Sequence, residues 1–166
     1  MGTGSGCIAL ALAAEDPFVH LTATDIDAAA LAVARRNAAR HGLEGRVDFY
    51  AGDLLAAAPP TWRFDLVVSN PPYVSQAEWE RLEPNVRDFE PRRALVGGED
   101  GLDVYRRLVP GAAAVLRPGG VLALEIGAAQ AAAVCDLVAA AGRFGAPRVR
   151  PDLAGLPRVV TAWLEA

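Results

Sequence analysis

An apolar run that stops abruptly at an amide and two prolines is the strongest constraint in this sequence. Residues 64–73 read Phe-Asp-Leu-Val-Val-Ser-Asn-Pro-Pro-Tyr. Branched apolar residues without polar alternation predict a strand that is buried on both faces of a parallel sheet. Asn70 then lies at the carboxyl end of this strand, where open parallel sheets bind their ligands. Because the prolines fix φ and bias Asn70 toward an extended backbone, we expect a stiff loop after the strand.

The groups in this loop suit a planar amine. The Asn70 side-chain oxygen and the Pro71 carbonyl can accept both hydrogens of one NH2 group, and the Tyr73 ring can stack on its plane. Such a nitrogen is a poor nucleophile, and two acceptors favour the pyramidal geometry in which its lone pair faces an electrophile. The loop therefore predicts an amide or aromatic amine substrate. The alternative is a Pro-rich turn that closes a core strand.

Composition limits the class of protein. The 166 residues suit one domain, and 52% hydrophobic with 22% charged residues predict a globular core. The net charge is −4 and no basic cluster exceeds a pair, which disfavours a broad nucleic-acid surface. No membrane span or export signal is recognisable, so the cytoplasm is the expected location. Cys7 and Cys135 are expected to be small buried residues without a chemical role.

A glycine loop opens the chain. Gly2-Thr3-Gly4-Ser5-Gly6 leads directly into a predicted helix over residues 7–14. In doubly wound folds, such glycines let the backbone approach a cofactor at a helix N-terminus. The strand that should precede them is missing, and a lone pattern of this kind can be an ordinary turn.

Two acids follow predicted strands. Residues 19–24 predict a strand that ends at Asp25, about 20 residues past the glycines, where an acidic side chain takes ribose hydroxyls. This spacing predicts a nucleoside cofactor. After a further strand over residues 46–51, Asp53 could accept a hydrogen bond from an adenine amine while Leu54 packs on the base. The alternative role for Asp53 is a helix N-cap or a turn.

The remaining elements follow from periodicity and capping. Asp27 is the expected N-cap of a helix over residues 28–41. Residues 74–101 predict a long, ordered loop that faces the substrate, with a short helix near 76–82 and apolar anchors at Trp79, Phe89 and Leu95. Further predicted elements are helices over 102–116 and 128–141, a core strand over 121–126, and an antiparallel hairpin of residues 148–150 and 158–164.

Together these features resemble a class I S-adenosylmethionine-dependent methyltransferase. Residues 86–102, and Asp152-Leu153-Ala154-Gly155 with Arg158-Val159-Val160, look like the peptide-chain release factor glutamine methyltransferases, the HemK/PrmC family. The resemblance covers essentially the whole chain. It implies an α/β, Rossmann-like sheet with helices on both faces and a C-terminal antiparallel hairpin, in one catalytic domain over residues 1–166.

The resemblance also implies roles for single residues. The implied cofactor is S-adenosyl-L-methionine. Its methionine part would be lined by Gly2, Thr3, Gly4, Ser5 and Gly6. Asp25 would bind its ribose, and Asp53 with Leu54 would bind its adenine. Asn70 would bridge cofactor and substrate, Asn70 and Pro71 would hold a glutamine amide, Pro72 would shape the loop, and Tyr73 would pack on the glutamine. The implied reaction methylates N(5) of the glutamine in the Gly-Gly-Gln motif of release factors. A monomer without a metal, and without direct membrane or nucleic-acid binding, is expected.

The chain departs from the family pattern at its start. Family members carry an N-terminal helical domain, a first strand and an acid before the glycines, whereas Met1 stands directly ahead of Gly2 here. We therefore expect a truncated domain whose sheet has a gap between the strands ending at Asp25 and Asn70. Three alternatives stay open: a ribosomal-protein glutamine methyltransferase, an N6-adenine methyltransferase of nucleic acid, and a cofactor-binding remnant without turnover. The run Asp88-Phe89-Glu90-Pro91 favours the release factor.

Overall fold

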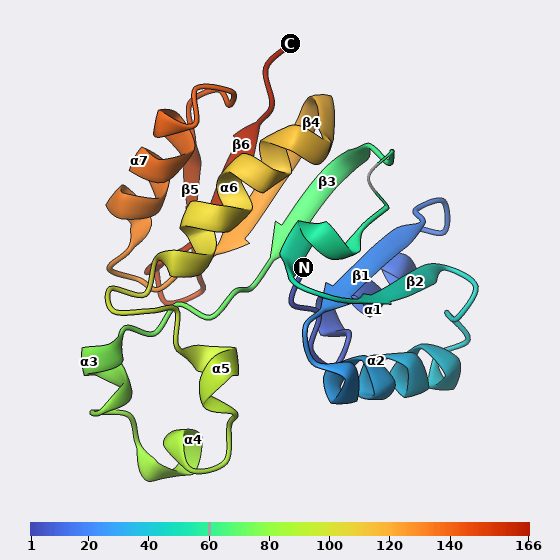
Figure 1. Cartoon of the computed structure of the whole chain (residues 1–166). Helices are drawn as coiled ribbons and strands as arrows, with labels where there is room; N and C mark the ends of the chain where they lie inside the picture. Colours follow the sequence, from blue (N-terminus) through green and yellow to red (C-terminus); the bar gives the residue numbers. More distant parts are fainter. Residues whose placement is uncertain (60) are drawn as a thin grey trace. The chain divides into compact units, whose positions relative to one another are not determined.

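The computed structural model describes residues 1–59 and 61–166 and divides them into two compact units (Figure 1). Unit 1 is Met1–Trp62 and unit 2 is Arg63–Ala166, and each has its own sheet. Strands β1 and β2 pair with each other, while the second sheet has the order β3-β4-β6-β5. No described strand is hydrogen-bonded to both β1 and β3.

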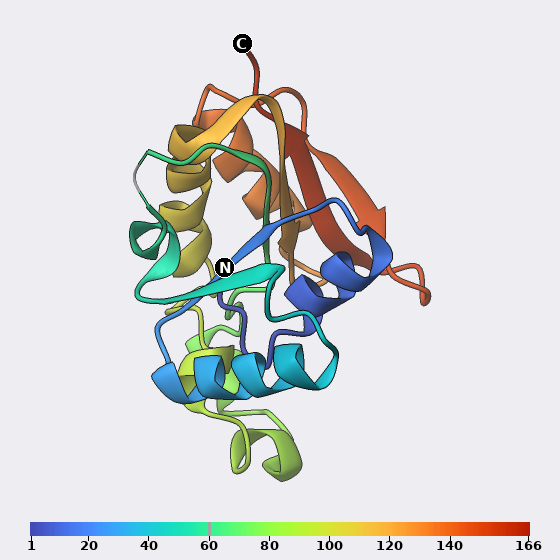
Figure 2. The same cartoon turned by 90° about the vertical axis from the view of Figure 1, so that its right-hand side faces the viewer.

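Unit 1 is a short parallel sheet with two helices. Its elements are α1 (Cys7–Glu15), β1 (Leu21–Asp25), α2 (Ala28–Arg40), β2 (Val47–Ala51) and the 3-10 helix η1 (Leu54–Ala57). One buried cluster joins both helices to the same face of the sheet, and its members are Leu10, Ala13, Ala23, Ala38 and Val47. Figure 2 shows α1 and α2 on one side of the two strands. The predicted cap is confirmed, because the Asp27 side chain accepts a hydrogen bond from Ala29 N.

Unit 2 combines parallel and antiparallel pairing. Its elements are β3 (Phe64–Ser69), α3 (Gln76–Trp79), α4 (Pro84–Arg87), α5 (Arg92–Leu95), α6 (Asp103–Val115), β4 (Leu116–Glu125), α7 (Ala131–Ala140), β5 (Arg148–Pro151) and β6 (Pro157–Trp163). Strand β3 runs parallel to β4, and β6 is antiparallel to both β4 and β5, which confirms the predicted hairpin. The three short helices lie in one excursion of the chain between β3 and α6 (Figure 1).

Burial of β3 differs from the prediction. Val67 and Ser69 are buried beside Leu122 and Leu124 of β4, whereas Leu66 is 39% exposed and Val68 is half-buried. Alternate side chains of a strand point to opposite faces. One face of β3 therefore joins the core of unit 2, and the other face does not.

Several predicted boundaries and exposures were also wrong. Helix α7 starts at Ala131 rather than Ala128, and β4 starts at Leu116 rather than Val121. Phe89 is 84% exposed and therefore does not anchor its loop, and Cys7 is exposed rather than buried. The sequence also predicts a loop over residues 56–62, because two prolines follow each other at positions 59 and 60. This loop overlaps η1 and includes Pro60, which lies outside the described residues.

A buried tyrosine ties α6 to the end of β4. The Tyr105 side chain is fully buried, and its hydroxyl donates a 2.6 Å hydrogen bond to the Glu125 carbonyl. Burial raises the pKa of Tyr105 well above its usual value. Strand β4 ends at Glu125, so this bond fixes the point where the chain leaves the sheet.

We predict that Tyr105→Phe lowers the free energy of unfolding by about 1–2 kcal/mol, because the Glu125 carbonyl loses its buried donor. Tyr50→Phe is the matched control, since the half-buried Tyr50 ring packs edge-on against Trp62 and its hydroxyl bonds to no described residue. Urea unfolding of both variants measures the difference. Equal stabilities for the two variants would show that the Tyr105 hydroxyl contributes nothing.

Candidate active site

The glycine loop of unit 1 is held at the carboxyl end of β1 by backbone hydrogen bonds. Thr3 N donates to the Thr24 carbonyl at 3.0 Å, and Gly6 N donates to the Thr3 carbonyl at 2.8 Å. Gly4 has a φ of +56°, and a Cβ built on it would meet no atom within 4 Å. The turn is thus fixed by its bond to β1, while the space around the Gly4 Cα is free of other atoms. A loop whose backbone binds a ligand requires both features.

Helix α2 supports this loop from the side. A Cβ at Gly6 would lie 3.2 Å from the Ala34 Cβ, so glycine allows the close approach of loop and helix. The side-chain nitrogen Nδ2 of Asn37 donates to the Ser5 carbonyl at 2.8 Å. Sequence reasoning missed Asn37, since its position within a helical pattern gives no sign of a contact 32 residues away.

Asp25 joins the glycine loop to the start of the next turn. Its Oδ2 accepts from Gly4 N and its Oδ1 from Asp27 N, both at 2.8 Å. A carboxylate offers about four acceptor sites, so about two remain for a ligand's hydroxyl groups. The half-buried Asp25 carboxylate therefore fits the predicted contact with a ribose.

The turn after β2 lies at the same end of the sheet. Gly52 N donates to the Asp25 carbonyl at 2.9 Å, and the Thr24 hydroxyl donates to the Leu54 carbonyl at 3.1 Å. Leu54 has a φ of +49°, a left-handed conformation that costs a non-glycine residue roughly 1–2 kcal/mol. Asp53 is exposed at the N-cap position of η1, where its side chain makes no cap bond and its carbonyl accepts from Ala56 N at 3.2 Å, so the alternative of a turn residue stays open.

In unit 2, the Asn-Pro-Pro-Tyr loop follows β3 directly. Asn70 is exposed, Pro71 is buried, and Pro72 and Tyr73 are half-buried. Within the described part of the chain, neither the Asn70 side chain nor the Pro71 carbonyl has a hydrogen-bond partner. In that part of the chain, both acceptors predicted for a planar NH2 group are thus without a partner, and the Asn70 side chain is the exposed one of the two.

A segment of the long loop forms backbone hydrogen bonds with the residue that follows the Asn-Pro-Pro-Tyr sequence. We call residues 95–101 the strap. Val74 N donates to the Leu95 carbonyl at 2.8 Å, and Gly97 N donates to the Val74 carbonyl at 2.9 Å. These two bonds place the strap alongside the residue that follows Tyr73.

Glycines make this contact possible. A Cβ at Gly97 would lie 2.4 Å from the Pro72 carbonyl oxygen, and one at Gly101 would lie 2.2 Å from the Tyr73 carbonyl oxygen. Both distances are far inside van der Waals contact, so only glycine fits at either position. Sequence reasoning missed this role, because glycines in a long loop resemble ordinary turns.

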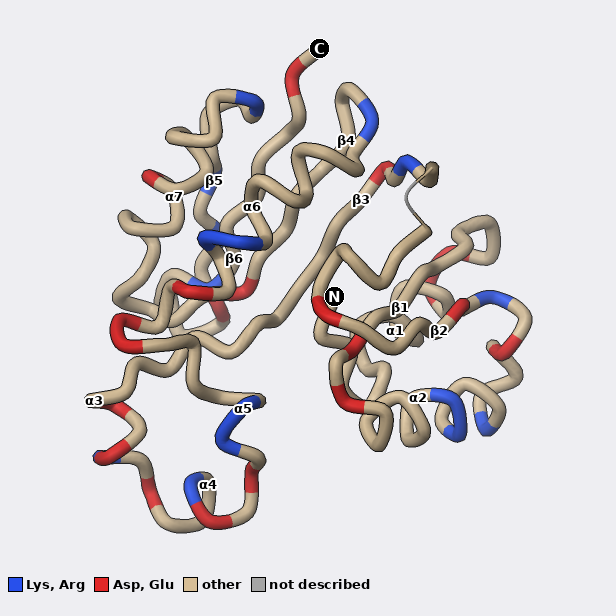
Figure 3. Tube along the Cα trace, viewed as in Figure 1, with Lys and Arg blue, Asp and Glu red and all other residues tan. Residues whose placement is uncertain are grey.

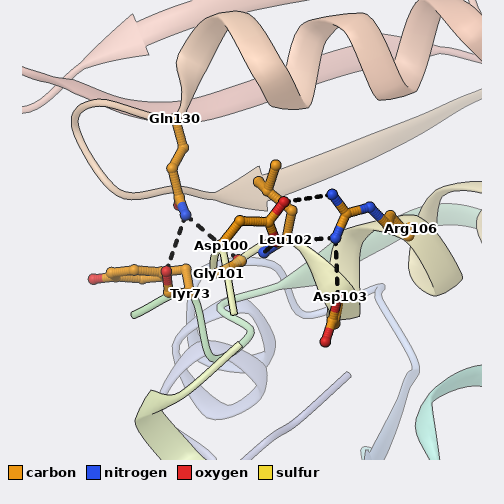
Figure 4. Close-up of polar contacts among 7 residues, drawn as sticks. All are labelled: Tyr73, Asp100, Gly101, Leu102, Asp103, Arg106 and Gln130. Atoms are coloured by element: carbon orange, nitrogen blue, oxygen red, sulfur yellow. Dashed lines mark hydrogen bonds and ion pairs between the residues drawn. The ribbon is translucent and has the colours of Figure 1, made fainter. Parts of the chain in front are cut away.

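An ion-pair network fixes the end of the strap to α6 (Figure 4). The Arg106 guanidinium donates to both carboxylate oxygens of Asp100, at 2.9 and 2.5 Å, and to Asp103 Oδ1 at 2.9 Å. Arg106 lowers the pKa of Asp100 to about 2, so this carboxylate stays ionised at neutral pH. Leu102 N also donates to Asp100, at 3.1 Å.

A pocket of about 340 Å³ adjoins the Asn-Pro-Pro-Tyr loop. Its lining residues are Tyr73, Val74, Glu78, Arg81, Leu82, Gly127, Ala128, Ala129 and Gln130. Glu78 accepts from Ser75 N at 2.8 Å and from the Ser75 hydroxyl at 2.7 Å, which lowers the pKa of Glu78. The volume suits a side chain or a short peptide segment.

Residues 1–59 and 61–166 contain no group of three or more His, Cys, Asp or Glu side chains that could hold a metal ion. In the same residues, no helix is both long and apolar enough to cross a membrane.

The model of the methyltransferase small domain family matches residues 1–83, half of the chain. The chain belongs to this family. The matched region contains the glycine loop, Asp25, Asp53 with Leu54, and the Asn-Pro-Pro-Tyr sequence. Membership of this S-adenosylmethionine-dependent family agrees with the cofactor predicted from the sequence.

Similar curated proteins are release factor glutamine methyltransferases. The one from Cereibacter sphaeroides is 52% identical over 166 residues, which are 100% of this chain and 59% of that protein. The one from Moorella thermoacetica is 51% identical over 162 residues, covering 98% of this chain and 56% of the relative. This methyltransferase chain thus spans somewhat more than half the length of the relatives it matches, and the resemblance stated from its motifs is confirmed.

Solved structures show the fold. A methyltransferase from Pyrococcus furiosus has a TM-score of 0.74 at 19% identity, covering 99% of this chain and 73% of that one. The ribosomal protein L11 methylase of Lactobacillus delbrueckii subsp. bulgaricus has a TM-score of 0.68 at 20% identity, covering 99% and 68%. These likenesses confirm the predicted α/β, Rossmann-like class.

We predict that Gly101→Ala destabilises the chain by about 1–3 kcal/mol more than Gly119→Ala, the cost of overpacking against the Tyr73 carbonyl. The two glycines have nearly the same φ, +77° and +79°, but a Cβ at Gly119 would meet nothing within 4 Å. The pair therefore separates steric overlap from backbone strain. Chemical unfolding of both variants provides the measurement, and equal losses would contradict the tight contact at Gly101.

Proposed function

We propose that the chain transfers a methyl group from S-adenosyl-L-methionine to the side-chain amide nitrogen of the glutamine in the Gly-Gly-Gln motif of peptide chain release factors. The observation that carries this proposal is a pair of acceptors without partners in the described chain, the Asn70 amide oxygen and the Pro71 carbonyl. They lie on a loop that packs tightly against the glycines of the strap. The names of the similar curated proteins support the choice of substrate.

The acceptor amide binds to the Asn-Pro-Pro-Tyr loop. Its two N–H groups donate to Asn70 Oδ1 and to the Pro71 carbonyl, and the Tyr73 ring packs on the glutamine side chain. Two acceptors aimed at these hydrogens draw the nitrogen lone pair out of conjugation with its carbonyl. Pro71 and Pro72 limit the backbone of the loop, so the acceptors do not have to reorganise during the reaction.

The glycine loop and the two acids of unit 1 fit the methyl donor. The open turn at Gly4 accommodates the methionine part, the Asp25 carboxylate retains acceptor sites for the ribose hydroxyls, and Asp53 with Leu54 takes the adenine. When bound, S-adenosyl-L-methionine supplies a methyl group already activated on a sulfonium. Because that methyl group is already activated, the residues of this chain contribute mainly binding and orientation. The products would be the N-methylated amide, S-adenosylhomocysteine and one proton, which the amide nitrogen would release to water after the transfer.

Three alternatives make different predictions. A ribosomal-protein glutamine methyltransferase would use the same amide chemistry, and the L11 methylase shares the fold. An N6-adenine methyltransferase is disfavoured, because Arg residues lie singly or in pairs among acidic ones along the chain (Figure 3). A cofactor-binding remnant would bind the donor without transfer.

We further propose that the protein is a cytoplasmic monomer.

Labelled methyl transfer distinguishes these candidates. We expect incorporation into a release factor, with none into the same protein carrying Gln→Ala in its Gly-Gly-Gln motif. Incorporation only into a ribosomal protein or an oligonucleotide would replace the proposal with that alternative. Calorimetric binding of S-adenosyl-L-methionine without transfer to any acceptor would identify the remnant.

We predict that Asn70→Ala lowers kcat by about 10²–10³-fold, the usual effect of removing one preorganised transition-state contact. Binding of S-adenosyl-L-methionine should weaken far less, since the donor contacts predicted in unit 1 are unchanged. Steady-state kinetics and calorimetry test both expectations, with unfolding curves as a control for folding. Equal losses in rate and donor affinity would mean that Asn70 only holds the donor.

A further inference from the structure

We propose that Gln130 is a positioning residue for methyl transfer, because its side-chain amide fixes the Tyr73 carbonyl, and with it the Asn-Pro-Pro-Tyr loop, against the strap. Gln130 lies 57 residues from Tyr73, at the N-cap of α7. This inference rests on the proposed function for its catalytic readout. Its structural readout is independent of that function.

The Gln130 backbone is anchored on both sides. Gln130 N donates to the Gly127 carbonyl at 2.9 Å, and Val134 N donates to the Gln130 carbonyl at 2.9 Å. The first bond closes the turn after β4, and the second starts α7. The side chain therefore projects from a fixed point.

The Gln130 amide connects three segments of chain. Its Oε1 accepts from Gly127 N at 3.0 Å, which orients the amide plane. Its Nε2 then donates to the Tyr73 carbonyl at 2.9 Å and, more weakly, to the Gly101 carbonyl at 3.4 Å (Figure 4). One half-buried amide thus joins the turn before α7, the Asn-Pro-Pro-Tyr loop and the strap.

Packing leaves this amide little freedom. A Cβ at Gly101 would lie 2.6 Å from Gln130 Nε2, and one at Gly127 would lie 2.9 Å from Gln130 Oε1. Both glycines therefore permit the amide to approach the backbone. The same Gln130 side chain lines the pocket beside Tyr73, so its orientation also shapes that wall.

The consequence for the reaction is geometric. Asn70 and Pro71 have no partners of their own in the described chain, so their position depends on how the rest of the loop is held. The strap and Gln130 hold the two following residues, Pro72 and Tyr73. Without the Gln130 donor, the acceptors would move relative to the bound amide, and a displacement of about 1 Å can cost roughly 10²-fold in rate.

Two substitutions at Gln130, to Glu and to Ala, test the proposal. They distinguish the acceptor role of the amide oxygen from the donor role of the amide nitrogen. A glutamate carboxylate still accepts from Gly127 N but presents an oxygen, not a donor, to the Tyr73 carbonyl. Protonation restores one O–H donor. Because the introduced carboxylate would face two carbonyl oxygens at a half-buried position, its pKa should rise above the usual value of about 4.3. The Gln130→Glu variant should therefore lose about 10-fold or more in kcat near pH 8 and regain activity, relative to wild type, as the pH falls toward about 5.5. Gln130→Ala should stay low throughout.

Two acidic groups around Gln130 have lowered pKa values and do not titrate in this range. Glu78 and Arg81 line the same pocket, and Asp100 pairs with Arg106 behind Gly101. Ser75 lowers the pKa of Glu78, and Arg106 lowers that of Asp100 to about 2, so both carboxylates stay ionised. Ala132→Glu is the matched control, since it adds the same charge to an exposed position of α7 outside the pocket lining.

We expect donor affinity to be unchanged in all three variants, and the kcat ratio of Ala132→Glu to wild type to be flat with pH. The Gly127 amide hydrogen should exchange faster in Gln130→Ala but remain protected in Gln130→Glu. Wild-type kcat in both Gln130 variants, or a pH-independent loss in Gln130→Glu, would overturn the positioning role. Absence of methyl transfer by the wild-type protein would instead refute the proposed function, while the exchange result would still test the Gln130 contact.

Discussion

The candidate site depends on a backbone contact that excludes side chains. The carbonyls of Pro72 and Tyr73 lie so close to Gly97 and Gly101 that a single methyl group at either glycine would overlap them. Because main-chain atoms have few alternative positions, such a contact fixes a loop more firmly than flexible side chains could. Asn70 and Pro71 can therefore stay unpartnered without losing their direction.

Each half of the chain uses the same construction. In unit 1 the glycine loop is bonded to Thr24 and Asp25 at the end of β1, and Asn37 of α2 supports it. In unit 2 the loop after β3 is bonded to the strap and to Gln130. In both, a turn beyond the carboxyl end of a parallel strand carries the groups for a ligand, and a polar side chain from a helix holds the turn.

Much of this could be predicted from the sequence, because local signals specify local structure. Asp27 marked the start of α2, an unbroken apolar run located β3, and the hairpin followed from two short strands on either side of a turn. The glycine loop, Asp25 and the Asn-Pro-Pro-Tyr sequence were also recognisable, since each combines unusual residue types at a meaningful spacing.

The supports of the site could not be predicted in this way. Gln130, Asn37 and the glycines of the strap act through contacts between residues distant in sequence, and their own neighbours carry no pattern that indicates them. Phe89 was misjudged for a related reason, because an aromatic residue in a loop packs only if the fold brings a surface to it, and here 84% of it is exposed. The start of α7 also differs from the prediction, because residues 127–130 form a turn and Gln130 caps the helix that follows it.

The glycines of the strap also determine how freely related sequences can vary. Exposed residues in α4 and next to Phe89 can be replaced by other residue types with little loss of stability. At Gly97 and Gly101, by contrast, any Cβ would overlap a backbone carbonyl, although neither glycine has a side chain with which to touch a substrate. A survey of natural variants that looked only for ligand contacts would overlook two of the least replaceable positions in the molecule.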